Sequence, residues 1–396
     1  MLTQNILSKL ITTFYNIILL LFCSYFLDEE NYQSFNLLYT AILIISAFFF
    51  TPLIKLKSRY YFIADMKNSL NNYFWKSIKT NNLIIISILV VSIVLYFFFE
   101  TSLFYFNPSL YLLIVVIFLM NHHNQYCILE RDFNALKTQQ LFRLGLLIAC
   151  LIVVMCFKLF SYWYLLAVIL ISNLFYIKNH SIIVPKKDDS NTPFKSKFKA
   201  FLIPLYFLTA LNLSYDYVDR FIVKVFYNPE VFNQIYKFFD IQVLVVGSVY
   251  AIIYNHFFSV LQKKYSIRKE IKSYNQSVKI YVEVLIYTGL VLFLNFFFIY
   301  KYSTLVAFLS INHIHLITVL FLILWSFKLF YFDMLLFFEE KTKIVFYILL
   351  AVNVLNFICY FIFKNFEYPG YIFISKLSIA ILGLLISGLF LKKKFS

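Results

Sequence analysis

Acidic and basic residues lie within one long apolar segment, Phe198–Tyr227, of this 396-residue chain. Asp216, Arg220 and Lys224 follow one another at i, i+4 and i+8, which places them on one face of a helix, and Asp219 lies beside them. Ionisable residues inside apolar segments are costly and usually mark an ion pair or a pathway. Arg and Lys donors in a partly desolvated cavity bind phosphate and diphosphate groups, so this segment predicts an anion-binding site.

Other apolar segments carry charges that could complete such a site. The segment Val231–Tyr254 contains Lys237 and Asp240, which are three residues apart and share one face of a helix. We expect the anion to be bound by Arg220, Lys237, Lys224 and Lys328. The residues expected to balance these charges, or to take up a coupling ion, are Asp216, Asp219, Asp240, Glu283 and His122.

A structural role is the alternative for the deepest cations. Arg220 and Lys237 could form a buried ion-pair network that holds their two helices together. In that case we expect Asp216 or Asp219 to be the partner of Arg220, because both lie within one turn of it.

Charges near the ends of apolar segments could instead reach the membrane surface. Lys224 and Lys376 lie near one end of their segments and could extend their amines to the interface. Glu283 lies near the opposite end of its segment, where an interfacial position is expected. His122 could take part in proton coupling because histidine titrates near neutral pH, but an interfacial position is expected for it and for His123.

Signatures of enzymes and metal sites do not occur in the sequence. It contains no P-loop, HExxH motif, glycine-rich phosphate loop or Ser-His-Asp arrangement. None of the five cysteines forms a CxxC pair, and all lie in or beside apolar stretches. We therefore expect no catalysis, no cofactor and no metal.

The composition indicates a polytopic membrane protein. Hydrophobic residues make up 62% of the chain and charged residues 14%, with a mean hydropathy of +0.79. Soluble domains contain roughly 45–50% apolar and 25% charged residues. A chain this long and this apolar cannot bury its apolar surface in a water-soluble fold.

A membrane-spanning helix needs about 20 mostly apolar residues. This criterion predicts twelve spans, of which the fourth is the weakest because His122, His123, Asn124 and Gln125 interrupt it. The predicted spans are Leu10–Leu27, Phe35–Ile54, Leu83–Phe99, Ser109–Leu129, Leu141–Phe157, Tyr162–Ile177, Phe198–Tyr227, Val231–Tyr254, Ile280–Tyr300, Ile314–Phe332, Ile344–Phe363 and Tyr371–Leu391.

Basic residues predict the orientation of these spans. Most of the 35 Lys and Arg residues lie near span ends on the side that holds the N-terminus, whereas the opposite side holds only Lys158, Lys301 and Lys364. Cytoplasmic loops are rich in Lys and Arg, so we expect both termini in the cytoplasm. The formal net charge of +16 is then a feature of topology and indicates no nucleic-acid partner.

The chain is expected to consist of two halves. The stretch 178–197 contains two prolines and many charges, which is typical of a cytoplasmic linker, and it separates residues 1–177 from 198–396 with six spans in each. The segment FLDEENYQSF at 26–35 aligns without a gap with FYNPEVFNQI at 226–235, at equivalent span ends. This predicts a parallel repeat about an axis along the membrane normal.

Two longer motifs carry a resemblance to a known family. The sequences LDEENYQSFNLL after the first span and SYDYVDRFIVKVFYNPEVFNQIY across the seventh and eighth resemble bacterial polysaccharide (O-antigen type) flippases of the multidrug/oligosaccharidyl-lipid/polysaccharide exporter superfamily. Asp219-Arg220 and Pro204 match recurrent residues of that family, which has Gly where Gln33 and Asn233 stand here. The resemblance implies an all-α, MATE-like fold of twelve transmembrane helices in two six-helix bundles.

The resemblance also implies a function. Members flip a polyprenyl-diphosphate-linked oligosaccharide across the bacterial inner membrane by alternating access through a cationic central cavity. It leaves H⁺ and Na⁺ open as coupling ions and allows contacts with other polysaccharide-assembly membrane proteins. The alternatives are a drug or cation antiporter of the same superfamily and a membrane glycosyltransferase. The antiporter would favour acidic cavity residues, and the glycosyltransferase would need longer outward loops than this chain has.

Overall fold

The computed structural model describes residues 2–60, 67–99, 108–130, 132–174, 194–227, most of 229–243 with residue 246, 313–329, 342–363 and 371–395. The regular elements within these ranges are helices, which agrees with the predicted all-α class. They are α1 (Leu2–Phe26), α2 (Glu29–Tyr60), α3 (Lys67–Phe99), α4 (Pro108–Glu130), α5 (Phe133–Cys156), α6 (Tyr162–Asn173), α8 (Lys195–Phe226), α11 (His313–Phe327), α13 (Thr342–Phe363) and α14 (Tyr371–Phe395).

The helices match the predicted spans where the structure describes them. Seven are long and apolar enough to cross a membrane, which supports a multi-pass membrane protein. The fourth predicted span forms the continuous helix α4, so its polar residues do not interrupt it. Described residues of the eighth span, 231–254, are helical as far as 246, and the ninth span, 280–300, lies outside the described residues.

Two apolar cores divide the described helices. One core is built mainly from α1 to α6, which we call the N-terminal bundle. The other is built mainly from α8, the helical residues of 229–246, α11, α13 and α14, which we call the C-terminal bundle. Residues 178–193 of the predicted linker 178–197 lie outside the described residues. The last three residues of the predicted linker belong to α8, which begins at Lys195.

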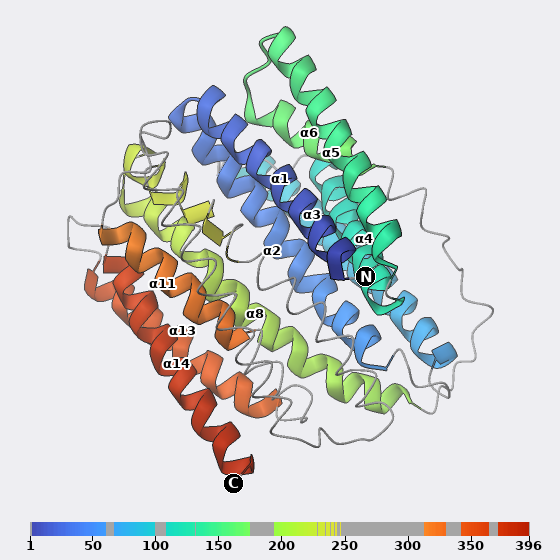
Figure 1. Ribbon diagram of the computed structural model, residues 1–396, viewed down its shortest axis with the longest axis vertical. Coiled ribbons are helices and arrows are strands. Elements are labelled where there is room, and N and C mark those ends of the chain that lie inside the picture. Colours follow the sequence, from blue (N-terminus) through green and yellow to red (C-terminus); the bar gives the residue numbers. More distant parts are fainter. Residues whose placement is uncertain are drawn as a thin grey trace.

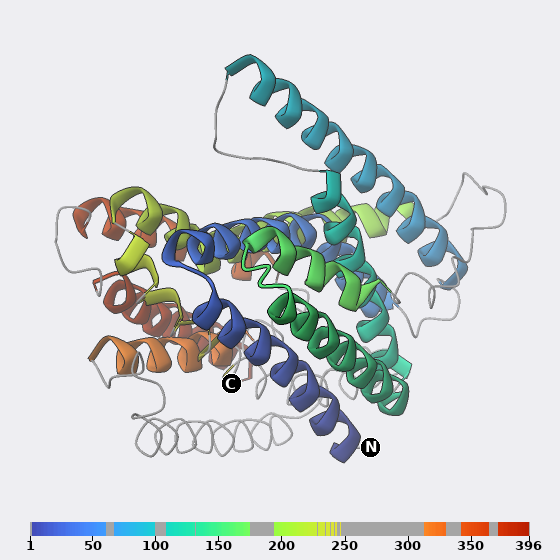
Figure 2. The ribbon, with the colours of Figure 1, turned by 90° about the horizontal axis from the view of Figure 1, so that it is seen from above.

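Helices α2 and α8 join the two bundles and lie side by side along their length (Figure 1). At one end, the ring of Tyr60 on α2 packs against Phe198 and Phe201 on α8, with ring centroids 5.4 and 5.7 Å apart. Helices α1, α5 and α6 lie to one side of this pair and α11, α13 and α14 to the other (Figure 1). Seen from above, the pair runs across the picture, and α1, α5 and α11 lie below it (Figure 2). The two bundles therefore meet along α2 and α8.

The turn between α1 and α2 explains the acidic residues in the first repeat segment. The Asp28 side chain accepts a hydrogen bond from the backbone N–H of Asn31 at 2.7 Å and caps the start of α2. Hydrogen bonds from the backbone N–H and the side-chain amide of Asn31 lower the pKa of Asp28, which lies between the spans. Asn233 of the second repeat segment donates to the carbonyl of Glu29 at 3.2 Å, so the two segments lie against each other.

Candidate functional site

A cavity of about 480 Å³ lies between the bundles. Its walls include residues of α1, α2, α4, α5 and α6 on one side and of α8, the 239–246 segment, α11 and α14 on the other. The charged residues that line it within the described ranges are Lys9, Arg143, Asp216, Arg220, Asp240 and Lys376. The cavity thus brings together charges from five separate segments of the chain.

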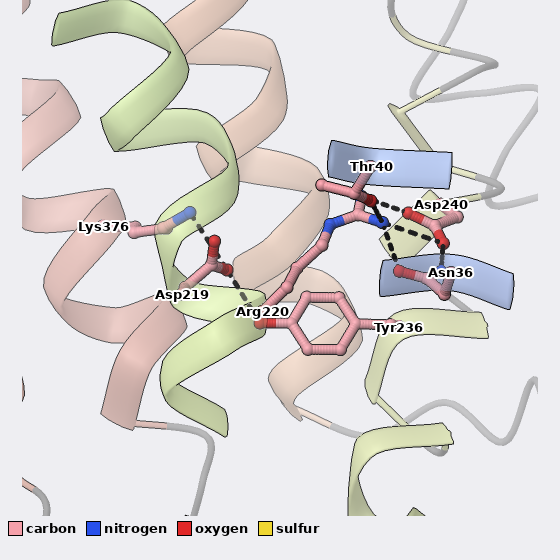
Figure 3. A network of polar contacts seen from close by, with 7 residues as sticks. All are labelled: Asn36, Thr40, Asp219, Arg220, Tyr236, Asp240 and Lys376. Atoms are coloured by element: carbon pink, nitrogen blue, oxygen red, sulfur yellow. Dashed lines mark hydrogen bonds and ion pairs between the residues drawn. The ribbon is translucent and has the colours of Figure 1, made fainter. Parts of the chain in front are cut away.

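Arg220 lies on the cavity wall at the junction of the bundles (Figure 3). Its Nη2 forms an ion pair with Asp240, and its Nη1 donates to Asn36 Oδ1 at 2.7 Å and to Thr40 Oγ1 at 3.2 Å. Asn36 Nδ2 in turn donates to Asp240 Oδ2 at 2.6 Å. These contacts form one network that connects α2, α8 and the 229–246 segment. The network is buried, since Arg220 and Asp240 are only 6% and 8% exposed.

The partner of Arg220 differs from the one predicted by the ion-pair alternative. Asp216 and Asp219 are within one helical turn of Arg220, but its ion pair is with Asp240 on the next helix. The guanidinium of Arg220 points toward Asn36 and Thr40 on α2 and away from Asp219 (Figure 3). The network joins the seventh and eighth spans, as that alternative expected, but Lys237 donates to the carbonyl of Ser24 and not to this network.

A second buried pair lies at the cavity wall, where Lys376 lines the cavity and its partner Asp219 does not. Lys376 Nζ is 3.1 Å from Asp219 Oδ2, and both side chains are fully buried. Asp219 also accepts a hydrogen bond from the Tyr236 hydroxyl at 2.9 Å. Lys376 therefore does not extend to the membrane surface, and it binds α14 to α8 within the C-terminal bundle (Figure 3).

Asp216 and Lys328 both contact the Trp325 indole. Asp216 lines the cavity and accepts a hydrogen bond from Trp325 Nε1 at 3.0 Å. Lys328 is fully buried, and its Nζ lies 4.7 Å from the centroid of the Trp325 ring. Of the predicted site residues in the C-terminal bundle, Asp216, Arg220 and Asp240 line the cavity, whereas Lys328 and Asp219 lie behind it.

The other predicted cations do not reach the cavity. Lys237 donates from Nζ to the carbonyl of Ser24 at 3.3 Å, and its amine lies 4.9 Å from the centroid of the Tyr32 ring. It therefore links the 229–246 segment to the end of α1. Lys224 is exposed near the end of α8, as its position in the sequence suggested. Glu283 lies outside the described residues.

His122 is buried within the N-terminal bundle and not at an interface. It is 6% exposed, its ring stacks on Phe74 with centroids 5.1 Å apart, and its Nε2 is 3.0 Å from Lys57 Nζ. The polar stretch around it turns inward because α4 packs against α2 and α3. His122 lines a small pocket with Lys57 and Gln125, separate from the central cavity.

Sequence reasoning missed Lys9 and Arg143. Both lie near the ends of predicted spans, where Lys and Arg residues are expected to set the orientation. The structure places them on the cavity wall, Lys9 on α1 and Arg143 on α5. A signal was available for Arg143, which follows Leu141 and Phe142 and precedes a long apolar run, but spacing alone does not show which way its side chain points.

Uncharged side chains make up most of the cavity wall. Amide side chains come mainly from the N-terminal bundle: Asn16, Asn36, Asn121, Asn124 and Asn173. Aromatic side chains come from both bundles: Phe35, Tyr39, Tyr217, Phe239, Phe321 and Trp325. Within the described part of the chain, no group of three or more His, Cys, Asp or Glu residues could hold a metal ion.

Comparisons with known proteins support the fold. No protein-family model matches the sequence, and no curated protein does. Among solved structures, a MOP superfamily transporter from Pyrococcus furiosus, whose binding pocket is described as having reverse polarity, has a TM-score of 0.64 at 12% identity, over 98% of this chain and 94% of that chain. An outward-facing multidrug resistance MATE family transporter has 0.64 at 14%, over 99% and 94%.

A third similar structure is the eukaryotic MATE transporter AtDTX14, with a TM-score of 0.65 at 13% identity, over 98% of this chain and 93% of that chain. The likeness extends over almost the whole length of each of these proteins, including both bundles. Sequence identity this low is evidence of shared architecture and not of shared substrate. The chain therefore has the all-α, two-bundle fold of MATE transporters of the MOP superfamily.

Proposed function

We propose that this protein flips a polyprenyl-diphosphate-linked oligosaccharide across the bacterial inner membrane by alternating access between its two bundles. The head group and sugars pass through the central cavity while the polyprenyl chain stays in the bilayer. The motif resemblance to O-antigen type flippases and the MATE-like fold both support this proposal.

One observation carries the proposal: among the described residues that line the cavity, cationic side chains outnumber anionic ones. Four of these described lining residues are Lys or Arg, and two are Asp. Cations in a partly desolvated cavity favour a phosphorylated head group, and they disfavour the positively charged compounds that a cation antiporter takes.

The remaining wall residues suit an oligosaccharide. A volume of about 480 Å³ is within the usual range of small-molecule sites, roughly 300–1,000 Å³. Asparagine amides both donate and accept hydrogen bonds and can pair with sugar hydroxyls. Aromatic rings such as Tyr39, Tyr217 and Trp325 offer flat apolar faces to the C–H faces of sugar rings.

Alternating access requires contacts between the bundles to break and re-form. The hydrogen bonds of Arg220 to Asn36 and Thr40 cross between the bundles, and so does that of Asn36 to Asp240. We propose that they close one side of the cavity in this conformation. The Arg220–Asp240 pair lies within the C-terminal bundle and can move with it as a unit.

The proposal includes the orientation and the domain plan. Both termini and the linker 178–197 lie in the cytoplasm, and residues 1–177 and 198–396 each contribute six spans. The uneven distribution of Lys and Arg residues supports this topology. The coupling ion is H⁺ or Na⁺, and other polysaccharide-assembly membrane proteins are proposed partners.

A drug or cation antiporter is the second candidate, and Asp216 is the observation that favours it. Its carboxylate lines the cavity and accepts a hydrogen bond from the Trp325 indole, and no cation in the described ranges lies within ion-pair distance of it. An acid in that position could attract a cationic compound or a coupling ion.

A genetic experiment separates the two candidates. Deleting the gene in its native host should abolish the cell-surface glycan, cause lipid-linked repeat units to accumulate inside the cell and leave drug tolerance unchanged. Expression of the wild-type chain should restore the glycan. Unchanged glycan together with increased sensitivity to cationic drugs would support the antiporter and contradict the proposal.

A further inference from the structure

The two walls of the cavity differ in how their cations are compensated. In the C-terminal bundle, Arg220 is paired with Asp240 and Lys376 with Asp219. Asp216 adds a further negative charge on the same side. These cations are already neutralised by the protein, so that wall offers little net attraction to an anion.

The wall from the N-terminal bundle has cations and no acid among its described lining residues. Its charged side chains are Lys9 and Arg143, and its other polar side chains are mostly asparagine amides. The net positive charge of the cavity is therefore concentrated on this wall. An anionic head group is expected to bind there, although sequence reasoning pointed to the seventh and eighth spans.

Arg143 is held in a fixed orientation. It is 4% exposed, and its Cζ lies 3.6 Å from the centroid of the Tyr15 ring on α1. The Tyr15 hydroxyl is itself held by Ser172 Oγ at 2.6 Å and by Asn173 Nδ2 at 3.3 Å on α6. A guanidinium stacked on an immobilised ring loses little further freedom when it binds a ligand.

The hydrogen-bond donors of Arg143 are largely unused. Among the described residues, its Nη1 has only a long contact of 3.4 Å to Gln140 Oε1, and its buried Nε has no hydrogen-bond partner. No acid in the described part of the chain forms an ion pair with it. Burial of a guanidinium without an anion costs free energy, because the charge is desolvated and not compensated. An anionic ligand that pairs with Arg143 removes this cost, which favours binding.

Lys9 supplies a second charge on the neighbouring helix. Lys9, Thr12 and Asn16 follow at i, i+3 and i+7, so they share the face of α1 that lines the cavity. Helix α1 packs against α5, which carries Arg143. No hydrogen bond or ion pair of the Lys9 amine occurs within the described residues.

We propose that Arg143 and Lys9 form the diphosphate-binding site of this protein, on the N-terminal bundle's wall of the cavity. That the ligand is a prenyl diphosphate rests on the proposed function. The position of the site rests on the distribution of charged side chains over the cavity wall. Arg143 contacts oxygens of one phosphoryl group with its planar fork, and Lys9 neutralises the other. Arg220 belongs to the contact between the bundles.

The test measures binding to the full-length protein purified in an uncharged detergent. The probes are farnesyl diphosphate, inorganic diphosphate and farnesol, and affinities are measured by calorimetry. Arg143→Gln and Lys9→Gln should each weaken binding of farnesyl diphosphate by roughly 10- to 100-fold, the usual effect of losing one charged donor. Arg143→Lys should lose less, and Lys79→Gln, at an exposed position on α3, should bind as the wild type does.

The outcomes separate the site from the function. Because the Lys9 amine has no partner among the described residues, Lys9→Gln tests the site even if Arg143→Gln unfolds. Tight binding by the wild type that neither substitution weakens would overturn the site and leave the flippase proposal intact. Inorganic diphosphate bound as tightly as farnesyl diphosphate would indicate a soluble ligand and contradict the lipid source. A wild type that binds neither diphosphate would contradict both proposals.

Discussion

Arg220 of the C-terminal bundle donates a hydrogen bond to Asn36 of the N-terminal bundle, with 2.7 Å between Nη1 and Oδ1. Asp240 accepts from both of these residues. A charge-assisted network of this kind stabilises the contact between the bundles in the present conformation. It also has to separate if the bundles move apart, so it connects stability with transport.

Removing Arg220 should destabilise the protein. Arg220→Ala leaves the buried Asp240 carboxylate without its cation, which typically costs about 3–5 kcal/mol. We expect a lower midpoint of thermal unfolding in detergent and less protein in the membrane. The control is Lys199→Ala, an exposed position on the same helix, which should unfold as the wild type does.

The double change Arg220→Ala with Asp240→Asn should recover much of that stability, because it removes the stranded charge. Arg220→Ala combined with Asp216→Asn should not, since Asp216 is held by Trp325 and not by Arg220. The unfolding midpoints of the three variants would decide this. Rescue by Asp216→Asn and not by Asp240→Asn would contradict the network described above.

A covalent link across the bundles should stop transport. In a variant without native cysteines, Asn36→Cys and Asp240→Cys place two thiols on opposite sides of the contact, where the native side chains are 2.6 Å apart. Oxidation, or a short bifunctional thiol reagent, should block glycan export. Reduction should restore export in the oxidised sample.

The matched control for this link is Ser58→Cys with Gln125→Cys, whose native side chains are 3.1 Å apart within the N-terminal bundle. Linking these two positions should leave export unchanged. Export that continues after complete linking of positions 36 and 240 would show that this contact does not open during transport.

The cap on α2 gives a prediction about pH. The folded-state pKa of Asp28 is lowered, so its contribution to stability is present above the unfolded pKa, near 4, and is lost as pH falls through the folded-state value. Asp28→Ala should lower stability by about 0.5–2 kcal/mol at neutral pH. Asp28→Asn keeps the cap without a titrating group, so thermal unfolding of this variant should lack that acid-dependent loss.

The charge distribution predicts the sidedness of the loops. Reporter fusions at Asp189 and Glu100 should show that the first lies in the cytoplasm and the second on the opposite side. A phosphatase reporter and a fluorescent-protein reporter at each position provide complementary signals. Equal sidedness of the two positions would contradict twelve spans with cytoplasmic termini.

Hydropathy predicted the helices well because each span has to be apolar over about the thickness of the bilayer. The continuity of α4 through His122 was less predictable. The His122 side chain is accommodated by contacts with Phe74 and Lys57, which lie on other helices. Such partners lie far away in the sequence, and no local pattern reveals them.

The cavity was predicted in kind but not in detail. Arg220, Asp216 and Asp240 were identified because charges inside apolar segments are rare. Position within a span does not show which way a side chain faces. Lys376 was therefore expected near the membrane surface, although it is buried. Lys9 and Arg143 were not predicted as site residues, although they line the cavity. The choice of Asp240 as the partner of Arg220 depends on how α8 packs against the following helix, which only the structure shows.

The most direct test of the central claim is transport in reconstituted vesicles. Proteoliposomes that contain the purified protein and a polyprenyl-diphosphate oligosaccharide with a labelled sugar are treated with an impermeant glycosidase, which digests only outward-facing sugars. We predict that the wild type makes the inner pool accessible and that Lys9→Gln and Arg143→Gln slow this strongly. An inner pool that stays protected with wild-type protein, while a cationic dye is transported by the same vesicles, would contradict the flippase account.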